Sequence, residues 1–279
     1  MTRPGMLLAL QLTLAMGGAG LALGQQSTTM PAATQPGKGR FIVLDRLRFT
    51  HYDRDPGPED RTIDRWTNTL TVGYGLSGGL SAFLDVPAVR QFIDSPGGDT
   101  DDTGIADLHA MLKWRFWQQD TSPLNTQRLS AMAGLDIPTY DAAFSSDGFD
   151  PMLGLVYTQI HERHGINAAL RYTFTTDSEA DPITPGSSDA DLLRYDASYL
   201  YRLVPARFTA DSPGAAYAML EFNGLYETNG DHELFISPGI MYEGRGWVVE
   251  LSVQLPLMQD LEHRPEAQVS VVLGVRVLF

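Results

Sequence analysis

From residue 41 to its end, the chain alternates between apolar and polar positions with a period of two. The last segment shows this most clearly: every second residue from Ala267 to Phe279 is apolar, and Gln268, Ser270 and Arg276 lie between them. Successive side chains of a β-strand point to opposite faces. The pattern therefore predicts strands with two chemically different faces.

About twelve such segments can be counted, which indicates an all-β chain. They lie near 41–52, 65–76, 79–87, 104–117, 127–137, 149–160, 164–176, 191–203, 215–226, 232–243, 246–257 and 267–279. An even number of antiparallel strands lets both ends of a closed barrel lie on one side of a membrane. In the first segment Asp45 interrupts the best register, so the faces of that strand stay unassigned.

The chemistry of the two faces distinguishes a membrane barrel from a soluble sandwich. One face is apolar along its length and carries Tyr, Trp or Phe near its ends, as lipid-facing strands with aromatic girdles do. The other carries Arg, Lys, Asp and Glu, which a sandwich core would have to desolvate at several kcal/mol each. We expect residues 41–279 to form a transmembrane antiparallel up-and-down β-barrel of the outer-membrane type. A soluble periplasmic β-sandwich is the alternative fold.

The connections between the segments alternate in length and charge. Three of the even-numbered connections are tight turns, at 76–79, 161–164 and 243–246. Five odd-numbered connections hold 20 of the 34 acidic residues, at 53–64, 94–104, 141–150, 177–191 and 258–266. Short turns on one rim and long loops on the other are typical of periplasmic and extracellular ends. Three connections depart from this rule, at 118–126, 204–214 and 227–231.

The residues before the first strand have a different pattern. Arg3 precedes a run of apolar and small residues that ends near Leu23 and is followed by polar residues. This is typical of a secretory signal peptide, which we assign to 1–24, with an uncleaved membrane anchor as the alternative. Residues 25–40 are rich in Ser, Thr, Pro, Gly and Gln, and we expect them to form a flexible N-terminal lead-in.

Charge and composition exclude several kinds of function. The chain has a formal net charge of −14 and contains no cysteine. So acidic a protein repels a phosphate backbone, and we expect no nucleic-acid partner. The lack of cysteine excludes disulfides, thiolate metal sites and a cysteine nucleophile. We expect no cofactor.

Short motifs suggest metal binding or catalysis, and each has a simpler interpretation. The His-Glu-Arg-His run at 161–164 is one residue short of the zinc-protease spacing and falls at an expected turn. The 99–104 segment imitates the start of a calcium loop, but Ala110 stands where glutamate is needed, so an EF-hand is excluded. Two interpretations of this segment remain: a solvated acidic loop, or a loop that binds a divalent cation loosely. No histidine has a neighbouring serine and no nucleophile elbow occurs, so we expect no enzyme.

The charged residues of the inner face are the candidate functional residues of such a barrel. By alternation they are Asp85, Asp107, Lys113, Arg115, Arg128, Asp136, Arg171, Arg194, Asp196, Arg202, Glu221, Glu250 and Arg276. These residues either pair across strands and stiffen the wall, or form a constriction that selects small polar or amphipathic solutes. About twelve strands leave a narrow passage, which Arg and Tyr side chains or residues 25–40 can obstruct.

The chain ends in Val275-Arg276-Val277-Leu278-Phe279. This resembles the C-terminal signal read by the outer-membrane barrel assembly machinery, with Val275, Val277 and Phe279 as the signal positions. Together with the closing strand pair, the runs Gly104-Ile105-Ala106-Asp107-Leu108 and Gly134-Leu135-Asp136-Ile137-Pro138-Thr139 resemble an outer-membrane family assigned to the MetA pathway of phenol degradation, or described as transporters. The resemblance implies a twelve-stranded barrel that passes small, including aromatic, molecules. It transfers no catalytic residues.

Together these features predict a Gram-negative outer-membrane channel that passes small molecules through a narrow, charge-laddered lumen. Its expected partners are outer-membrane lipid, the assembly machinery and a small-molecule solute. The acidic loops also predict a mild preference for cations at low salt. A non-conducting structural or ligand-binding barrel with acidic extracellular loops is the alternative function, and an outer-membrane hydrolase is a further one.

Overall fold

The computed structural model describes residues 26–56, 60–122, 124–141, 143–176, 183–186, 188–209 and 212–279. The expected signal peptide, residues 1–24, lies outside these described residues. Within them, no helix is long and apolar enough to cross a membrane. The strands are β1 (Phe41–Asp53), β2 (Thr62–Gly75), β3 (Leu80–Asp94), β4 (Thr100–Ile105), β5 (Leu108–Ser122), β6 (Asn125–Ile137), β7 (Asp150–His161), β8 (His164–Thr173), β9 (Leu192–Val204), β10 (Ala215–Glu227), β11 (His232–Glu243), β12 (Trp247–Asp260) and β13 (Glu266–Leu278).

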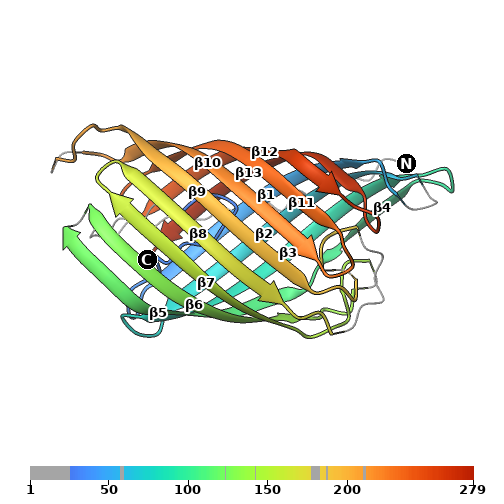
Figure 1. Cartoon of the computed structure of the whole chain (residues 1–279), viewed down its shortest axis with the longest axis horizontal. Coiled ribbons are helices and arrows are strands. Elements are labelled where there is room, and N and C mark those ends of the chain that lie inside the picture. The colour runs from blue at the N-terminus through green and yellow to red at the C-terminus, as the bar shows by residue number, and fades with distance from the viewer. Residues whose placement is uncertain are drawn as a thin grey trace, which may run out of the picture.

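All of these strands except β4 form one closed antiparallel barrel (Figure 1). Each strand of the ring pairs with its neighbours in the chain, and β1 pairs with β13 to close it. The closing pair runs from Ile42 opposite Leu278 to Asp53 opposite Glu266. Closure pairs the two edges that an open sheet would expose to lipid. The predicted all-β barrel of about twelve strands is therefore confirmed.

The sequence predicted a single strand at 104–117. This prediction is wrong in its continuity, because the structure divides the region between β4 and β5. The first part of β3 pairs with β5, and its second part pairs with β4. Pro87 lies where β3 changes partner, and proline has no N–H to donate to a sheet. The Pro87 carbonyl accepts a hydrogen bond from Ala106 N at 3.0 Å, in the gap between the two strands.

Asp107, also in this gap, organises the loop that follows β6. Its Oδ1 accepts hydrogen bonds from Thr139 N at 3.2 Å and Ser145 Oγ at 2.6 Å. Its Oδ2 accepts hydrogen bonds from Ser146 N at 2.8 Å and Ser146 Oγ at 2.6 Å. We expect Asp107→Ala to release this loop, because the loop loses its shared acceptor while the strand ladders are untouched.

The measurement for Asp107→Ala is limited proteolysis of the folded barrel, in which the loop after β6 should be cleaved faster than in the unaltered protein. Asp99→Ala changes an exposed carboxylate in the turn between β3 and β4 and should leave the cleavage rate of that loop unchanged. Equal protection of the loop in both variants would contradict the role given to Asp107.

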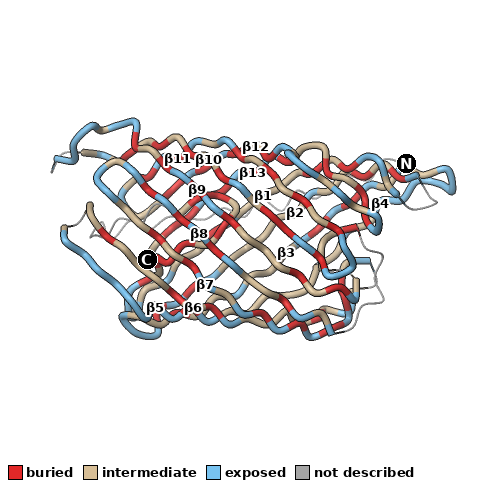
Figure 2. Tube along the Cα trace, in the orientation of Figure 1, coloured by how far each residue is buried: buried red, intermediate tan, exposed pale blue. Residues whose placement is uncertain are grey.

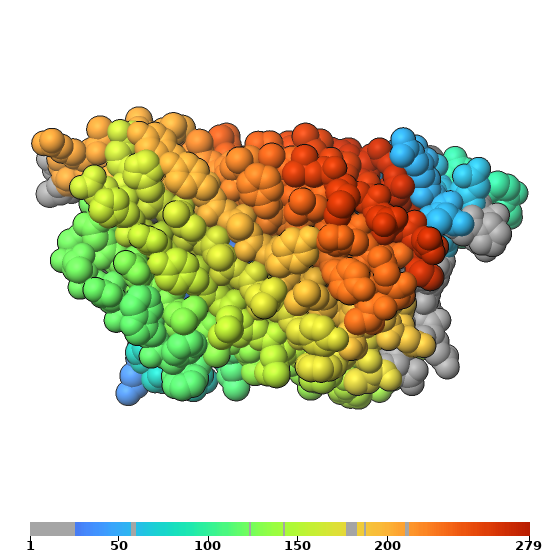
Figure 3. Space-filling view, viewed as in Figure 1, coloured from blue at the N-terminus to red at the C-terminus, as the bar shows by residue number. Residues whose placement is uncertain are grey.

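The alternation in the sequence corresponds to the two surfaces of the barrel wall (Figure 2). Leu170, Leu251 and Val271 point outwards, and 50%, 41% and 38% of their surface is exposed. Glu221 and Ser252, on the inner face, are 0% and 1% exposed. Outward side chains of neighbouring strands form a continuous wall on the face seen in Figure 3. A sandwich would place the apolar residues in its centre, so this alternative is excluded.

The short turns and the C-terminus lie at one end of the barrel and the long loops at the other (Figure 1). By the length of its turns, the first end is periplasmic. The connection predicted at 118–126 is mostly strand, because β5 extends to Ser122 and β6 begins at Asn125. Only β5 extends beyond its other neighbour, because its ladder with β3 ends at Trp114 opposite Leu80, whereas it pairs with β6 as far as Ser122.

Candidate functional site

Residues 26–37 lie inside the barrel, and we call them the plug segment. At one end of it, Pro36 O accepts a hydrogen bond from Ser81 Oγ of β3 at 3.4 Å. At the other end, Gln26 O accepts one from Arg276 Nη2 of β13 at 3.4 Å. Both wall residues lie near the end that carries the short turns. Both ends of the plug segment therefore lie near this end of the barrel.

A buried carboxylate of β10 anchors the plug segment. Glu221 Oε1 accepts a hydrogen bond from Thr28 N at 2.9 Å. Glu221 Oε2 accepts from Thr29 N at 3.0 Å and from Thr29 Oγ1 at 2.6 Å. Hydrogen bonds to a charged group contribute about 1.5–3 kcal/mol each, which is more than neutral ones do. Glu221 is thus a principal attachment point of the segment.

A lysine of β5 holds the following residues of the plug segment through their carbonyl groups. Lys113 Nζ donates to Ala32 O at 2.9 Å and to Thr34 O at 2.8 Å. Ala33 N donates to Thr158 Oγ1 of β7 at 2.8 Å. The segment is therefore tied to strands on several sides of the ring.

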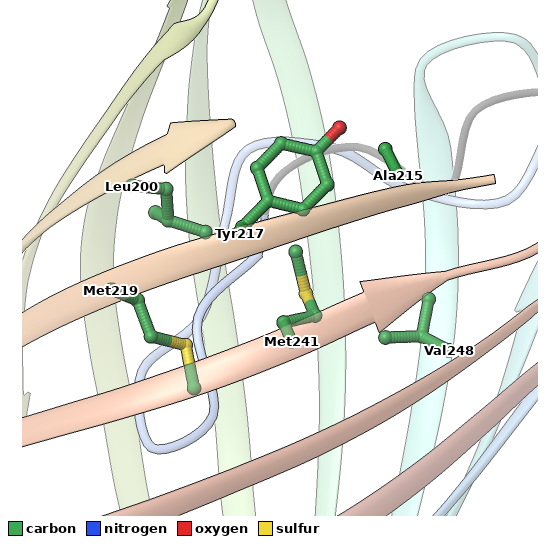
Figure 4. Packing of buried hydrophobic residues seen from close by; sticks show 6 residues of the cluster. All are labelled: Leu200, Ala215, Tyr217, Met219, Met241 and Val248. Carbon is green, nitrogen blue, oxygen red and sulfur yellow. The ribbon is translucent and has the colours of Figure 1, made fainter. Parts of the chain in front are cut away.

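Apolar contacts fill the space around these bonds. Met30 and Ala33 are buried against Met132, Met152 and Val156 of the inner wall. A second apolar cluster projects inwards from β9–β12 (Figure 4) and consists of Leu200, Ala215, Tyr217, Met219, Met241 and Val248. The side chains of the two clusters fill part of the periplasmic half of the lumen.

The composition of the plug segment suits this path. Pro31 and Pro36 lack an N–H, so they leave fewer backbone donors to satisfy inside the lumen. Gly75, at the end of β2, allows the chain to pass closely, since a Cβ there would lie 2.0 Å from Gly37 O. The sequence predicted residues 25–40 both as a flexible lead-in and as an obstruction of the passage. The structure places 26–37 across the lumen, and the flexibility stays a prediction.

Two cavities lie at different heights in the lumen. The inner cavity, of about 200 Å³, borders β1 at residues 42–46. The outer cavity, of about 460 Å³, borders β1 at residues 48–52 and is therefore nearer the long loops. Thr29 and Arg171 border both cavities. The plug segment thus stands between two spaces that would together form a passage.

Part of the loop after β8 reaches into the outer cavity. Ile183 is buried against Tyr52 of β1 and Phe235 of β11, within an apolar cluster on the inner face. Thr184 and Pro185 line the cavity. This extracellular loop therefore narrows the lumen from the end opposite to the plug segment.

A buried ionic network fixes the neighbouring loop between β12 and β13. Arg264 forms ion pairs with Glu227 at 2.6 Å and with Glu233 at 3.0 Å. Burial lowers the pKa of Arg264, but the charges of Glu233 and Glu227 outweigh it, so the pKa is raised above its usual value. The guanidinium therefore stays charged beside the outer cavity.

The thirteen predicted lumen residues fall into three groups in the structure. Those that border the cavities are Asp85, Lys113, Arg128, Arg171, Arg194, Asp196 and Arg276. Those that are buried on the inner face are Arg202, Glu221 and Glu250. The other three bond elsewhere: Asp107 to the loop after β6, Arg115 to Gly78 O, and Asp136 to His109.

The predicted charge ladder is replaced in part by bonds to the plug segment. Among the described residues, two ion pairs join members of the predicted set, Arg171–Asp196 and Arg276–Glu250, each at 2.8 Å. Glu221 and Lys113 bind the plug segment instead. The role of these charges in selecting a solute stays a prediction.

Sequence reasoning missed Arg48 and Arg65, which line the outer cavity. Asp45 faces outwards, where Asn68 Nδ2 donates to its Oδ1 at 2.7 Å. Alternation then places Arg46 and Arg48 on the inner face. The register of β1 against β13, whose faces are unambiguous, is the signal that could have identified them.

The motifs considered for metal binding or catalysis lie outside the two cavities. His161 and His164 face each other across the β7–β8 turn, and His164 Nδ1 lies 2.7 Å from Tyr199 Oη. Asp101 of β4 forms an ion pair with Arg90 at 3.0 Å. In the part of the chain that the structure describes, no three His, Cys, Asp or Glu side chains are grouped to hold a metal ion. That the protein is no enzyme and binds no cofactor stays a prediction.

Solved structures that resemble this barrel come from outer membranes. The COG4313 outer membrane channel from Pseudomonas putida F1 is 15% identical, with 90% of this chain and 97% of that chain covered at a TM-score of 0.57. At this identity the likeness shows the fold alone. The translocator domain of the autotransporter NalP from Neisseria meningitidis is 13% identical, with 88% and 91% covered, and its TM-score of 0.47 is too low for any argument. No curated protein matches the sequence.

The closed barrel and its apolar outer face place the protein in the outer membrane. Most of the chain, residues 32–267, also matches a single family. The matched region includes half of the plug segment and every strand of the barrel except most of β13. The chain belongs to the family described as "Putative MetA-pathway of phenol degradation".

Proposed function

We propose that this protein is an outer-membrane channel for small molecules, in which the plug segment blocks a narrow, charge-lined lumen and must move for a solute to pass. The observation that carries this proposal is the pair of cavities that meet at Thr29 and Arg171. A barrel that served only as a scaffold would gain stability from a continuous packed interior. Here the interior is interrupted by two spaces large enough for water and small solutes.

The walls of the cavities indicate the kind of solute. Met111, Met132 and Met152 line the inner cavity together with Lys113 and Arg276, so its lining is apolar in part and charged in part. Such a lining accepts small amphipathic molecules better than large or uniformly polar ones. Small aromatic molecules agree with both this lining and the description of the family.

The test is the conductance of the purified, refolded protein in a planar lipid bilayer. We expect discrete steps of small conductance, because the plug segment leaves little space for ions when it is bound. Steps that become larger or more frequent at high voltage would support displacement of the segment. If the bilayer stays sealed at every voltage, both for this protein and after removal of the plug segment, the barrel is a non-conducting one.

A further inference from the structure

The outer cavity is rich in guanidinium groups. Five arginines line it: Arg48, Arg65, Arg171, Arg194 and Arg264. Two carboxylates, Asp196 and Glu233, line it as well. The described lining therefore carries an excess of positive charge, although the chain as a whole has a net charge of −14.

Both carboxylates of the lining are already occupied. Asp196 pairs with Arg171 at 2.8 Å and also accepts a hydrogen bond from Asn223 at 3.0 Å. Glu233 pairs with Arg264 at 3.0 Å. Carboxylates of the wall thus neutralise the charges of Arg171 and Arg264. The charges of the other three arginines are not neutralised by an ion pair with any described residue.

The remaining arginines form no ion pair with a carboxylate within the described ranges. Arg48 Nη1 donates to the neutral amide of Gln254 at 3.0 Å, and Arg65 Nη1 donates to that of Gln91 at 3.2 Å. Arg194 makes no hydrogen bond or ion pair to any described residue. Like charges gathered in a partly enclosed space repel one another, so a bound anion would stabilise this arrangement.

The three arginines lie on opposite walls of the cavity. Arg48 and Arg65 are on the adjacent strands β1 and β2, two residues apart in register, since Arg65 is opposite Thr50. Arg194 is on β9, which is separated from β1 by four strands of the ring. A small anion between the walls could therefore receive hydrogen bonds from two sides, which a guanidinium group supplies in a planar, two-pronged geometry that matches a carboxylate.

Apolar side chains line the same space. Tyr52, Val89, Leu225 and Phe235 border the outer cavity, and each is at most 8% exposed. An inorganic anion would gain nothing from these groups. An organic anion would place its charge on the arginines and its apolar body against this part of the wall.

We propose that the outer cavity is a binding site for small organic carboxylates, held by Arg48, Arg65 and Arg194. The proposal deepens the channel function proposed above, because the site lies on the extracellular side of the plug segment and would capture the solute before it passes. Binding itself, however, can be measured without any passage through the barrel.

The experiment is calorimetric titration of benzoate into the refolded full-length barrel in detergent micelles, with empty micelles as the blank. Benzamide, which has nearly the same shape but no charge, is titrated in parallel. We expect benzoate to bind at least about tenfold more tightly than benzamide, since charge-assisted hydrogen bonds to the arginines are absent for the amide. Equal affinities would overturn the proposal, and so would an equal response to sodium sulfate, which would indicate a site for any anion.

The variant test replaces all three arginines by glutamine, which keeps length and polarity but removes the charge. We expect this triple variant to bind benzoate at least about tenfold more weakly. Arg207→Gln is the matched control, because it removes an exposed arginine outside both cavities. Unchanged affinity in the triple variant would overturn the assignment. If that variant does not refold, the benzoate–benzamide comparison on the unaltered barrel decides.

The outcomes separate this proposal from the channel function. Benzoate binding together with a sealed bilayer refutes the channel and leaves the binding site. Ion conductance together with equal binding of benzoate and benzamide refutes the carboxylate site and leaves the channel.

Discussion

Deletion of residues 26–35 should raise the conductance of the refolded barrel several-fold. The deletion removes the groups that separate the inner and outer cavities, so the spaces of about 200 and 460 Å³ become one passage. The strand ladders involve none of these residues, and the ring should still close. Single-channel recording in planar bilayers measures the effect directly. A deletion variant with the same step size as the intact protein would show that the plug segment is not the obstruction.

A second variant separates displacement of the plug segment from its absence. Glu221→Gln keeps the size of the side chain but replaces a carboxylate, which accepts three hydrogen bonds from Thr28 and Thr29, by a neutral amide. We expect the channel of this variant to open more frequently than that of the intact protein. Its conductance steps should be as large as those of the deletion variant. Glu162→Gln, in the exposed β7–β8 turn, is the control and should behave like the intact protein.

Glu250→Gln should destabilise the barrel by about 3–5 kcal/mol, because it leaves a buried guanidinium without its counter-charge. Glu250 Oε2 lies 2.8 Å from Arg276 Nη2, and the two side chains are 0% and 1% exposed. Arg276 Nη2 also donates to Gln26 O, so the loss should loosen one end of the plug segment. The measurement is the free energy of unfolding, obtained from denaturant titrations that are monitored by tryptophan fluorescence.

The control for this prediction is the exposed pair Arg54–Glu266, at 3.3 Å. Glu266→Gln should change the free energy of unfolding by less than about 1 kcal/mol, because solvent screens this pair. The double variant Glu250→Gln with Arg276→Met should recover part of the loss, since it removes the unpaired charge. A loss in the double variant equal to the sum of the two single losses would indicate that the two residues act independently.

The sequence determined the class of fold, because strands that are apolar along one face with aromatic residues near its ends, and charged along the other, favour a membrane barrel over a sandwich core. Leu170, Leu251 and Val271 face lipid as predicted from alternation alone. The alternation also identified Glu221 and Lys113 as inward groups, since that assignment needs only the parity of a residue within its strand. Where parity was interrupted, as at Asp45, the inner face of β1 and its arginines could not be assigned.

Only the tertiary structure decided what those inward groups meet. Pairing with charges on neighbouring strands was one of the two roles that the sequence left open for Glu221 and Lys113, and in the structure they bind residues 28–34. The acidic loops suggested a preference for cations, whereas five arginines and only two carboxylates line the outer cavity beneath them. Alternation describes one strand at a time, and it contains no information on contacts between strands across a lumen. The site is built from such contacts, between β1, β2 and β9 and between the wall and the N-terminal residues, which become neighbours only when the ring closes.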